Sequence, residues 1–105
     1  MGKIRAIVKR ADEQYGHVTW ISNTLKNLQT QVGVYIECVT SADGNFVIIC
    51  DEEGRLKGKP FNCTVNFGPY SCDFVGDIIA VGQGDEDFED LPEEITLKEW
   101  KEMIK

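Results

Sequence analysis

The sequence of 105 residues is long enough for one domain with a single hydrophobic core, but not for two. Its hydrophobic content of 42% is typical of globular rather than disordered proteins, and no apolar run approaches the roughly 20 residues of a membrane-spanning helix. Residues 1–6 show no cleavable signal pattern, so we expect a cytoplasmic protein, and the net charge of −7 disfavours direct binding to nucleic acid.

The first part of the chain predicts a β-hairpin followed by a helix. Residues 3–9 are β-branched and bounded by charge, and residues 17–21 alternate well enough to be the antiparallel partner. Apolar residues then recur at helical spacing, at Leu25, Leu28 and Val32. This spacing predicts a helix over about residues 23–32, with a polar residue at position 22 or 23 as its N-cap and Gly33 in a left-handed conformation at its end.

A second hairpin is expected over residues 34–50. Residues 34–39 and 46–50 surround a turn at Asp43-Gly44, a pair that tolerates positive φ. If the hairpin is symmetric about Gly44, Cys38 and Cys50 are cross-strand neighbours. Residues 46–50 are continuously apolar, which predicts a central strand covered on both faces.

Less regular sequence follows. Residues 55–62 form a basic, glycine-punctuated connection, residues 63–65 predict a short edge strand, and residues 66–72 predict a loop. Residues 77–81 predict the last strand, bracketed by glycines.

The ten residues 85–94, hereafter the acidic segment, account for the whole charge imbalance. Residues 1–84 carry 8 basic and 9 acidic side chains, whereas the acidic segment carries seven carboxylates and no base. These are Asp85, Glu86, Asp87, Glu89, Asp90, Glu93 and Glu94. A dense block of this kind on a nearly neutral body attracts basic surfaces, although charge runs are more often solvated linkers. We expect an acidic loop and a basic protein partner.

The chain ends with its clearest local signature, which predicts a helix over residues 97–104. Thr96 and Glu99 have the spacing of a capping box, and Ile95 can pack against Trp100. The order of elements, with tight turns between most strands, predicts a single α+β domain over residues 1–105 with a mostly antiparallel β-sheet and two helices.

Metal and cofactor sites are not expected. The cysteines are Cys38, Cys50, Cys63 and Cys72, with no Cys-x-x-Cys pair, and His17 is the only histidine. The acidic segment lacks the glycine and the distal glutamate of an EF-hand loop. Because no nucleophile has a base and an orienting group beside it in a recognisable pattern, we also expect no enzymatic activity.

Two further groups of residues are candidates for binding. Arg55, Lys57 and Lys59 with the nearby aromatic Phe61 could bind a nucleotide or another anion, although a solvated turn explains them as well. Phe67 and Tyr70 lie on a Gly-Pro loop, where they either anchor a partner or cap the core.

Several stretches carry a resemblance to a known family. They are residues 3–8, 24–29, 32–37, 47–54, 60–62 and 76–79. In this order they resemble a domain-of-unknown-function family of short proteins from phages, plasmids and conjugative elements of Firmicutes and other gut bacteria. The resemblance implies a mobile-element origin, where compact acidic proteins often counter host defence, and the size is similar to that of anti-CRISPR proteins.

Together these observations lead to a hypothesis of function. The chain would be a non-enzymatic type II anti-CRISPR that inhibits Cas9, with the acidic segment imitating the phosphates of DNA and Tyr70 or Phe67 as an apolar anchor. Two alternatives remain: sequestration of a nucleotide immune signal by the basic cluster, or an accessory regulatory role in the element.

Overall fold

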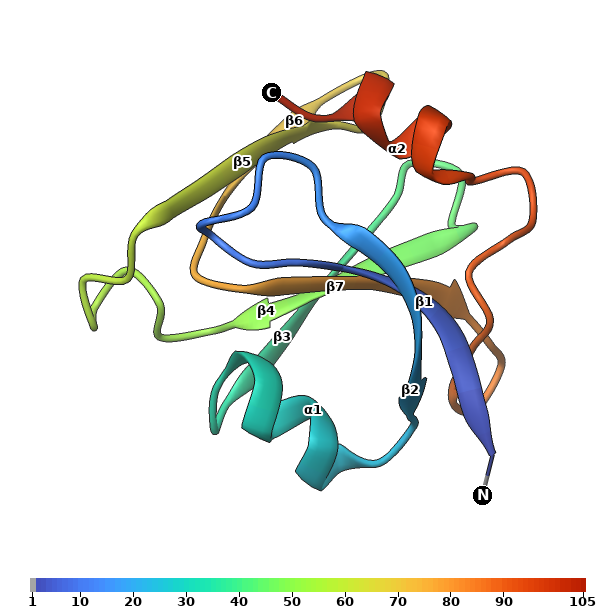
Figure 1. Ribbon diagram of the computed structural model, residues 1–105, viewed down its shortest axis with the longest axis horizontal. Helices are drawn as coiled ribbons and strands as arrows, with labels where there is room; N and C mark the ends of the chain where they lie inside the picture. Colours follow the sequence, from blue (N-terminus) through green and yellow to red (C-terminus); the bar gives the residue numbers. More distant parts are fainter. Residues whose placement is uncertain (1) are drawn as a thin grey trace.

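An antiparallel sheet of six strands forms the centre of the structure, a computed structural model that describes residues 2–105 (Figure 1). The strand order is β2-β1-β7-β4-β3, and β8 pairs with β7. The strands are β1 (Lys3–Lys9), β2 (His17–Ser22), β3 (Ile36–Thr40), β4 (Phe46–Asp51), β7 (Ile78–Gln83) and β8 (Phe88–Glu89). A second sheet pairs β5 (Phe61–Asn66) with β6 (Ser71–Val75), and the helices are α1 (Leu25–Val32) and α2 (Leu97–Met103).

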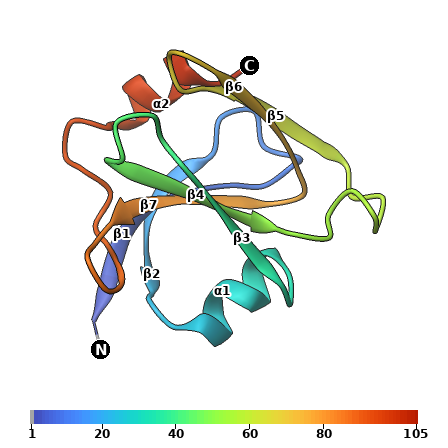
Figure 2. The same cartoon turned by 180° about the vertical axis from the view of Figure 1, so that it is seen from behind.

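The main sheet is covered on both faces, which gives the domain two hydrophobic clusters. α1 packs on one face through Leu28 and Val32, and the other face is covered by α2 and the β5–β6 sheet (Figures 1 and 2). All six residues of β4 are buried, because β4 lies between β7 and β3 under both covers. The predicted α+β class with a mostly antiparallel sheet and two helices is therefore confirmed, as is the central strand over residues 46–50.

α1 begins later than the sequence indicates. Its N-cap is Thr24, whose side-chain Oγ1 accepts a hydrogen bond from the backbone amide of Asn27 at 3.2 Å, so the expected cap at position 22 or 23 is wrong. Gly33 ends the helix with φ +151° and ψ 162°, an extended glycine conformation instead of the expected left-handed one. A Cβ there would lie 2.5 Å from the carboxylate of Asp51, so glycine is also required by close approach.

α2 docks on the core as predicted. Oγ1 of the N-cap Thr96 accepts a hydrogen bond from the backbone amide of Glu99, and Ile95 and Trp100 share one core cluster. Trp100 is fully buried, and its Nε1 donates to the carbonyl oxygen of Tyr15 at 2.7 Å. The helix ends at Met103 because the last two residues leave it to pair with β5.

The predicted hairpin over residues 34–50 is present, but its register is shifted. The backbone amide of Ser41 donates to the carbonyl oxygen of Phe46, which centres the turn between residues 43 and 44. Cys38 therefore pairs with Ile49, and Cys50 pairs with Glu37. Since opposed residues share a face, the expected Cys38–Cys50 pair is wrong: Cys38 is exposed and Cys50 is buried.

The region predicted as a loop over residues 66–72 contains the start of a strand. The turn itself is short, closed by a hydrogen bond from the amide of Phe67 to the carbonyl oxygen of Tyr70, and β6 begins at Ser71. β5 is also longer than predicted, since it spans six residues and pairs with β6 along its length. Neither helix within residues 2–105 has the length and apolar composition needed to cross a membrane.

The charged residue Lys9, at the end of β1, is buried in the fold. Only 2% of it is exposed, and its Nζ donates to Oδ1 of Asn62 at 2.6 Å and to the carbonyl oxygen of Glu13 at 2.7 Å. Nδ2 of Asn62 in turn donates to the carbonyl oxygens of Lys9 and Gly76. This cluster joins β1 to the start of β5.

Candidate partner-binding site

The acidic segment is an ordered part of the main sheet and not a plain loop. The amide of Gly84 donates to the carbonyl oxygen of Asp87 at 3.0 Å and closes a tight turn after β7. The chain then returns as β8, which pairs Gly82 with Glu89 and Gln83 with Phe88. The expectation of an acidic loop over residues 85–94 therefore holds only in part, since β8 lies within it.

The second half of the acidic segment fills a gap between β7 and the start of β1. β1 pairs with β7 only through residues 7–9, so its earlier residues lack β7 as a neighbour. Asp90 and Leu91 take that place: the amide of Arg5 donates to Oδ1 of Asp90 and the amide of Leu91 donates to the carbonyl oxygen of Arg5, both at 2.9 Å. A Cβ at Gly82 would lie 2.2 Å from the carbonyl oxygen of Asp90, so the insertion needs glycine there.

The side chain of Arg5 holds the backbone that follows. Its Nη1 donates to the carbonyl oxygen of Leu91 at 3.0 Å, and its Nη2 donates to that of Ile95 at 3.1 Å. Leu91 and Ile95 are both buried in the core cluster beneath α2. The guanidinium group thus holds the backbone on both sides of Glu93 and Glu94. Both hydrogen bonds are charge-assisted and therefore stronger than bonds between neutral groups.

All seven carboxylates of the acidic segment are exposed. None of them forms an ion pair with a basic group in residues 2–105. Their polar contacts are few, such as that of Asp90 with the amide of Arg5 and a long one, 3.5 Å, from Nδ2 of Asn45 to Glu94. The result is an anionic surface whose charge is uncompensated and whose backbone is ordered.

The two predicted aromatic anchors have different environments. Phe67 is half-buried and packs against the core, with its ring centroid 5.9 Å from that of Phe46 and 5.2 Å from that of Tyr70. Tyr70 is 43% exposed, and its hydroxyl donates to the carbonyl oxygen of Thr40 at 2.7 Å. Phe67 therefore caps the core, and Tyr70 is partly exposed to solvent.

A groove of about 710 Å³ brings Phe67 and Glu94 together. It lies between the β3–β4 turn, the β5–β6 turn and α2, and Figure 2 shows the β3–β4 turn beside the start of α2. Two further carboxylates line it, Asp43 and Glu99, and sequence reasoning missed both. We call this feature the acidic groove. Tyr70 is not among its lining residues.

Two of the three basic residues of the cluster are engaged by one buried carboxylate. Oδ2 of the buried Asp51 lies 3.0 Å from Nζ of Lys57 and 2.8 Å from Nζ of Lys59. Burial opposes ionisation of Asp51, but hydrogen bonds from Lys59, the amide of Glu53 and Lys57 outweigh it and lower its pKa to about 2. Nη2 of Arg55 donates to the carbonyl oxygen of Asp73, and Phe61 is 57% exposed.

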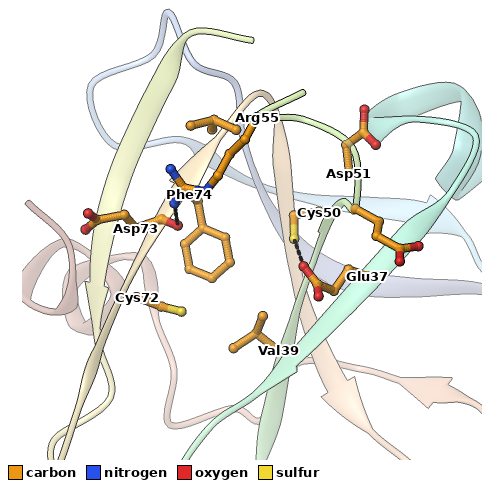
Figure 3. Close-up of a pocket in the computed structure, with 10 residues that line it drawn as sticks. Glu37, Val39, Cys50, Asp51, Arg55, Cys72, Asp73 and Phe74 are labelled. Carbon is orange, nitrogen blue, oxygen red and sulfur yellow. Dashed lines mark hydrogen bonds between the residues drawn. The ribbon is translucent and has the colours of Figure 1, made fainter. Parts of the chain in front are cut away.

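A pocket of about 280 Å³ between β3, β4 and β6 contains Arg55 but is poorly suited to an anion (Figure 3). The carboxylates that line it are Glu37, Asp51, Glu52 and Asp73. Its thiol Cys50 lies 3.9 Å from a carboxylate oxygen of Glu37, and burial followed by that carboxylate raises the pKa of Cys50 to about 12. A thiol in this state is a poor nucleophile. Within residues 2–105 no cluster of His, Cys, Asp or Glu has the arrangement to hold a metal ion.

Fold and site together define a small α+β domain that presents an ordered anionic surface. The chain belongs to the family described as "Domain of unknown function (DUF3846)", which matches residues 4–105. No curated protein and no solved structure gives a significant match. The predicted membership in a domain-of-unknown-function family is thus confirmed, whereas its mobile-element origin and its target stay predictions.

Proposed function

We propose that this protein is a non-enzymatic counter-defence protein of a mobile genetic element, and that it inhibits Cas9 by occupying a surface that normally binds DNA. The observation that carries the proposal is the acidic segment, whose seven carboxylates are exposed and without ion pairs in the described chain. Carboxylates of this density can replace phosphates in a channel lined by Arg and Lys.

Order in the backbone strengthens such binding. A flexible acidic tail loses conformational entropy when it docks, whereas the hydrogen bonds from Arg5 and the pairing of β8 with β7 have already ordered this segment. The remaining attraction is electrostatic, so association should be fast at low salt and weaken as salt rises.

The alternative of nucleotide sequestration receives less support from the geometry. Lys57 and Lys59 both point to the carboxylate of Asp51, so two of the three expected anion ligands are already engaged. The third, Arg55, lies in a pocket whose other charged residues are acidic. A basic protein therefore fits the surface of this chain better than a phosphate does.

The test is cleavage of plasmid DNA by Cas9 with increasing amounts of the protein. One variant carries Asp85→Asn, Glu86→Gln and Glu93→Gln, and the matched control carries Asp12→Asn, Glu52→Gln and Glu102→Gln. Both change the charge equally, and all six side chains are exposed. The proposal expects the first variant to lose inhibition about tenfold or more and the control to lose little, because local charge and not net charge matters.

Two results would contradict the proposal at different points. If no Cas9 from a panel of orthologues is inhibited, the target is wrong. If inhibition persists after neutralisation of all seven acids, the target stands and the phosphate mimicry is wrong.

A further inference from the structure

The acidic groove combines an apolar floor with three carboxylates from separate parts of the chain. The floor is formed by Phe46, Phe67, Ile95 and Met103. Asp43 comes from the β3–β4 turn, Glu94 from the end of the acidic segment and Glu99 from the first turn of α2. Within residues 2–105 no basic side chain lines the groove, so its charge is free to act on a ligand.

The carboxylates are available as acceptors. Asp43 accepts hydrogen bonds from Oγ of Ser41 and the amide of Asn45, and these two bonds, that of Ser41 first, lower its pKa and keep it ionised. Glu94 has the 3.5 Å contact with Asn45 already described. The side chain of Glu99 accepts no hydrogen bond from residues 2–105 in the structure. In the capping bond it is the backbone amide of Glu99 that donates to Oγ1 of Thr96.

We propose that the acidic groove binds the side chain of an arginine presented by the partner protein. The aliphatic part of an arginine can lie on the apolar floor, and its guanidinium can reach the carboxylates and the face of an aromatic ring. Arginine suits this site better than lysine, because its planar group is weakly hydrated and donates to two carboxylate oxygens at once.

This inference rests on the proposed function in one respect, namely that the partner presents a cationic surface. It adds a division of roles. The acidic segment attracts the partner over distance, while the groove selects one residue by shape and hydrogen bonding. Glu94 belongs to both features.

The direct test uses a short peptide and not Cas9. We would titrate the ¹⁵N-labelled protein at low salt with acetyl-Gly-Ser-Arg-Ser-Gly-amide, and with the same peptide carrying lysine or the uncharged citrulline in place of arginine. The expected result is saturable shifts of the amides of Asn45, Phe67 and Glu99, with the lysine peptide binding about threefold or more weakly and citrulline giving no saturation.

A pair of charge-matched variants separates the groove from the rest of the acidic surface. Glu94→Gln with Glu99→Gln removes two carboxylates of the groove, and Glu86→Gln with Glu93→Gln removes two outside it. We expect the dissociation constant of the arginine peptide to rise about tenfold in the first and less than threefold in the second. Exposed Glu→Gln changes keep the shape of the side chain, and unchanged melting curves would verify the fold.

The outcomes distinguish the groove from the proposed function. Equal binding of the lysine and arginine peptides, or equal losses in the two variants, would overturn the arginine site as mere counter-ion attraction. Peptide binding mapped to the groove together with no inhibition of any Cas9 would leave the site standing and reject the proposed target. Inhibition that survives Glu94→Gln with Glu99→Gln but fails after neutralisation of residues 85, 86 and 93 would leave the proposed target standing and contradict the division of roles, because the groove would then not contribute to inhibition.

Discussion

Arg5 and Asp90 are 85 residues apart in the sequence, yet the amide of Arg5 donates a hydrogen bond to Oδ1 of Asp90 at 2.9 Å. The side chain of the same arginine donates to carbonyl oxygens on the residues that follow Asp90. The anionic surface is therefore fastened to the first strand at one residue. The arrangement of these carboxylates therefore depends on a positively charged residue that contacts their backbone neighbours.

Replacement of Arg5 by alanine should loosen the acidic segment. The carbonyl oxygens of Leu91 and Ile95 lose their donor, and we expect a loss of about 2 kcal/mol in the free energy of unfolding, because charge-assisted hydrogen bonds are removed. Urea unfolding measures the loss, and amide hydrogen exchange at Leu91 measures the local opening. The control Arg10→Ala removes an exposed arginine whose ion pair with Asp77 spans 3.7 Å, so it should cost less than about 1 kcal/mol. Equal losses would contradict the role of Arg5.

Protonation of Asp51 at low pH should lower the free energy of unfolding. Its pKa is about 2 in the folded protein against an ordinary value of 3.8, so its stabilising contribution is complete above about pH 4 and is lost as the pH falls from about 4 to about 2. Asp51→Asn should cost about 2 kcal/mol at pH 7, since Lys57 and Lys59 lose their partner. It should also flatten the pH dependence in that window. Unfolding curves of both proteins at several pH values give the difference, and parallel curves would show that Asp51 is not responsible.

Lys9 and Asn62 should behave as a coupled pair. Asn62→Leu removes the side-chain acceptor at 2.6 Å and leaves the buried ammonium of Lys9 with backbone carbonyl acceptors alone, and we expect a loss of about 3 kcal/mol. Adding Lys9→Met removes the stranded charge, so the double variant should be more stable than Asn62→Leu alone. A double-mutant cycle by denaturant unfolding provides the coupling energy. Additive effects would mean that the two side chains act independently.

The cysteines should differ in reactivity with a thiol reagent at pH 8. Cys38 is exposed, although partial burial and then the carboxylate of Glu37 raise its pKa; burial raises the pKa of Cys63 to about 11, and burial with the nearby Glu37 raises that of Cys50 to about 12. We expect rapid modification of Cys38, slower modification of the half-buried Cys72, and modification of the other two only on unfolding. Mass spectrometry after timed labelling identifies the sites, and Cys38→Ser should remove the fast phase.

Much of the fold follows from local patterns. Both hairpins, both helices and the central strand over residues 46–50 could be predicted, because apolar periodicity and turn residues determine such elements locally. Details that depend on tertiary packing could not. The register of the second hairpin follows from the hydrogen bond that the amide of Ser41 donates to the carbonyl oxygen of Phe46. In β6, the polar residue Asp73 at the centre interrupts the apolar pattern by which a strand is recognised in a sequence.

The candidate site was predictable as a composition but not as a shape. The run of carboxylates is evident in the sequence, and all seven are exposed to solvent in the structure. The acidic groove is different, since Asp43, Glu94 and Glu99 come from three segments that only the tertiary fold brings together. The ion pairs of Lys57 and Lys59 with Asp51 could not be predicted either, although these residues lie close in the sequence, because they depend on how the chain folds back after β4.

The insertion of residues 90 and 91 beside β1 has a consequence for the order of folding. We expect contacts between residues so distant in the chain to form late, because the loop between their ends must close first. A partly folded chain would therefore carry the same negative charges without their arrangement. A cationic protein that requires this arrangement would bind the fully folded protein and would not bind the nascent or damaged chain.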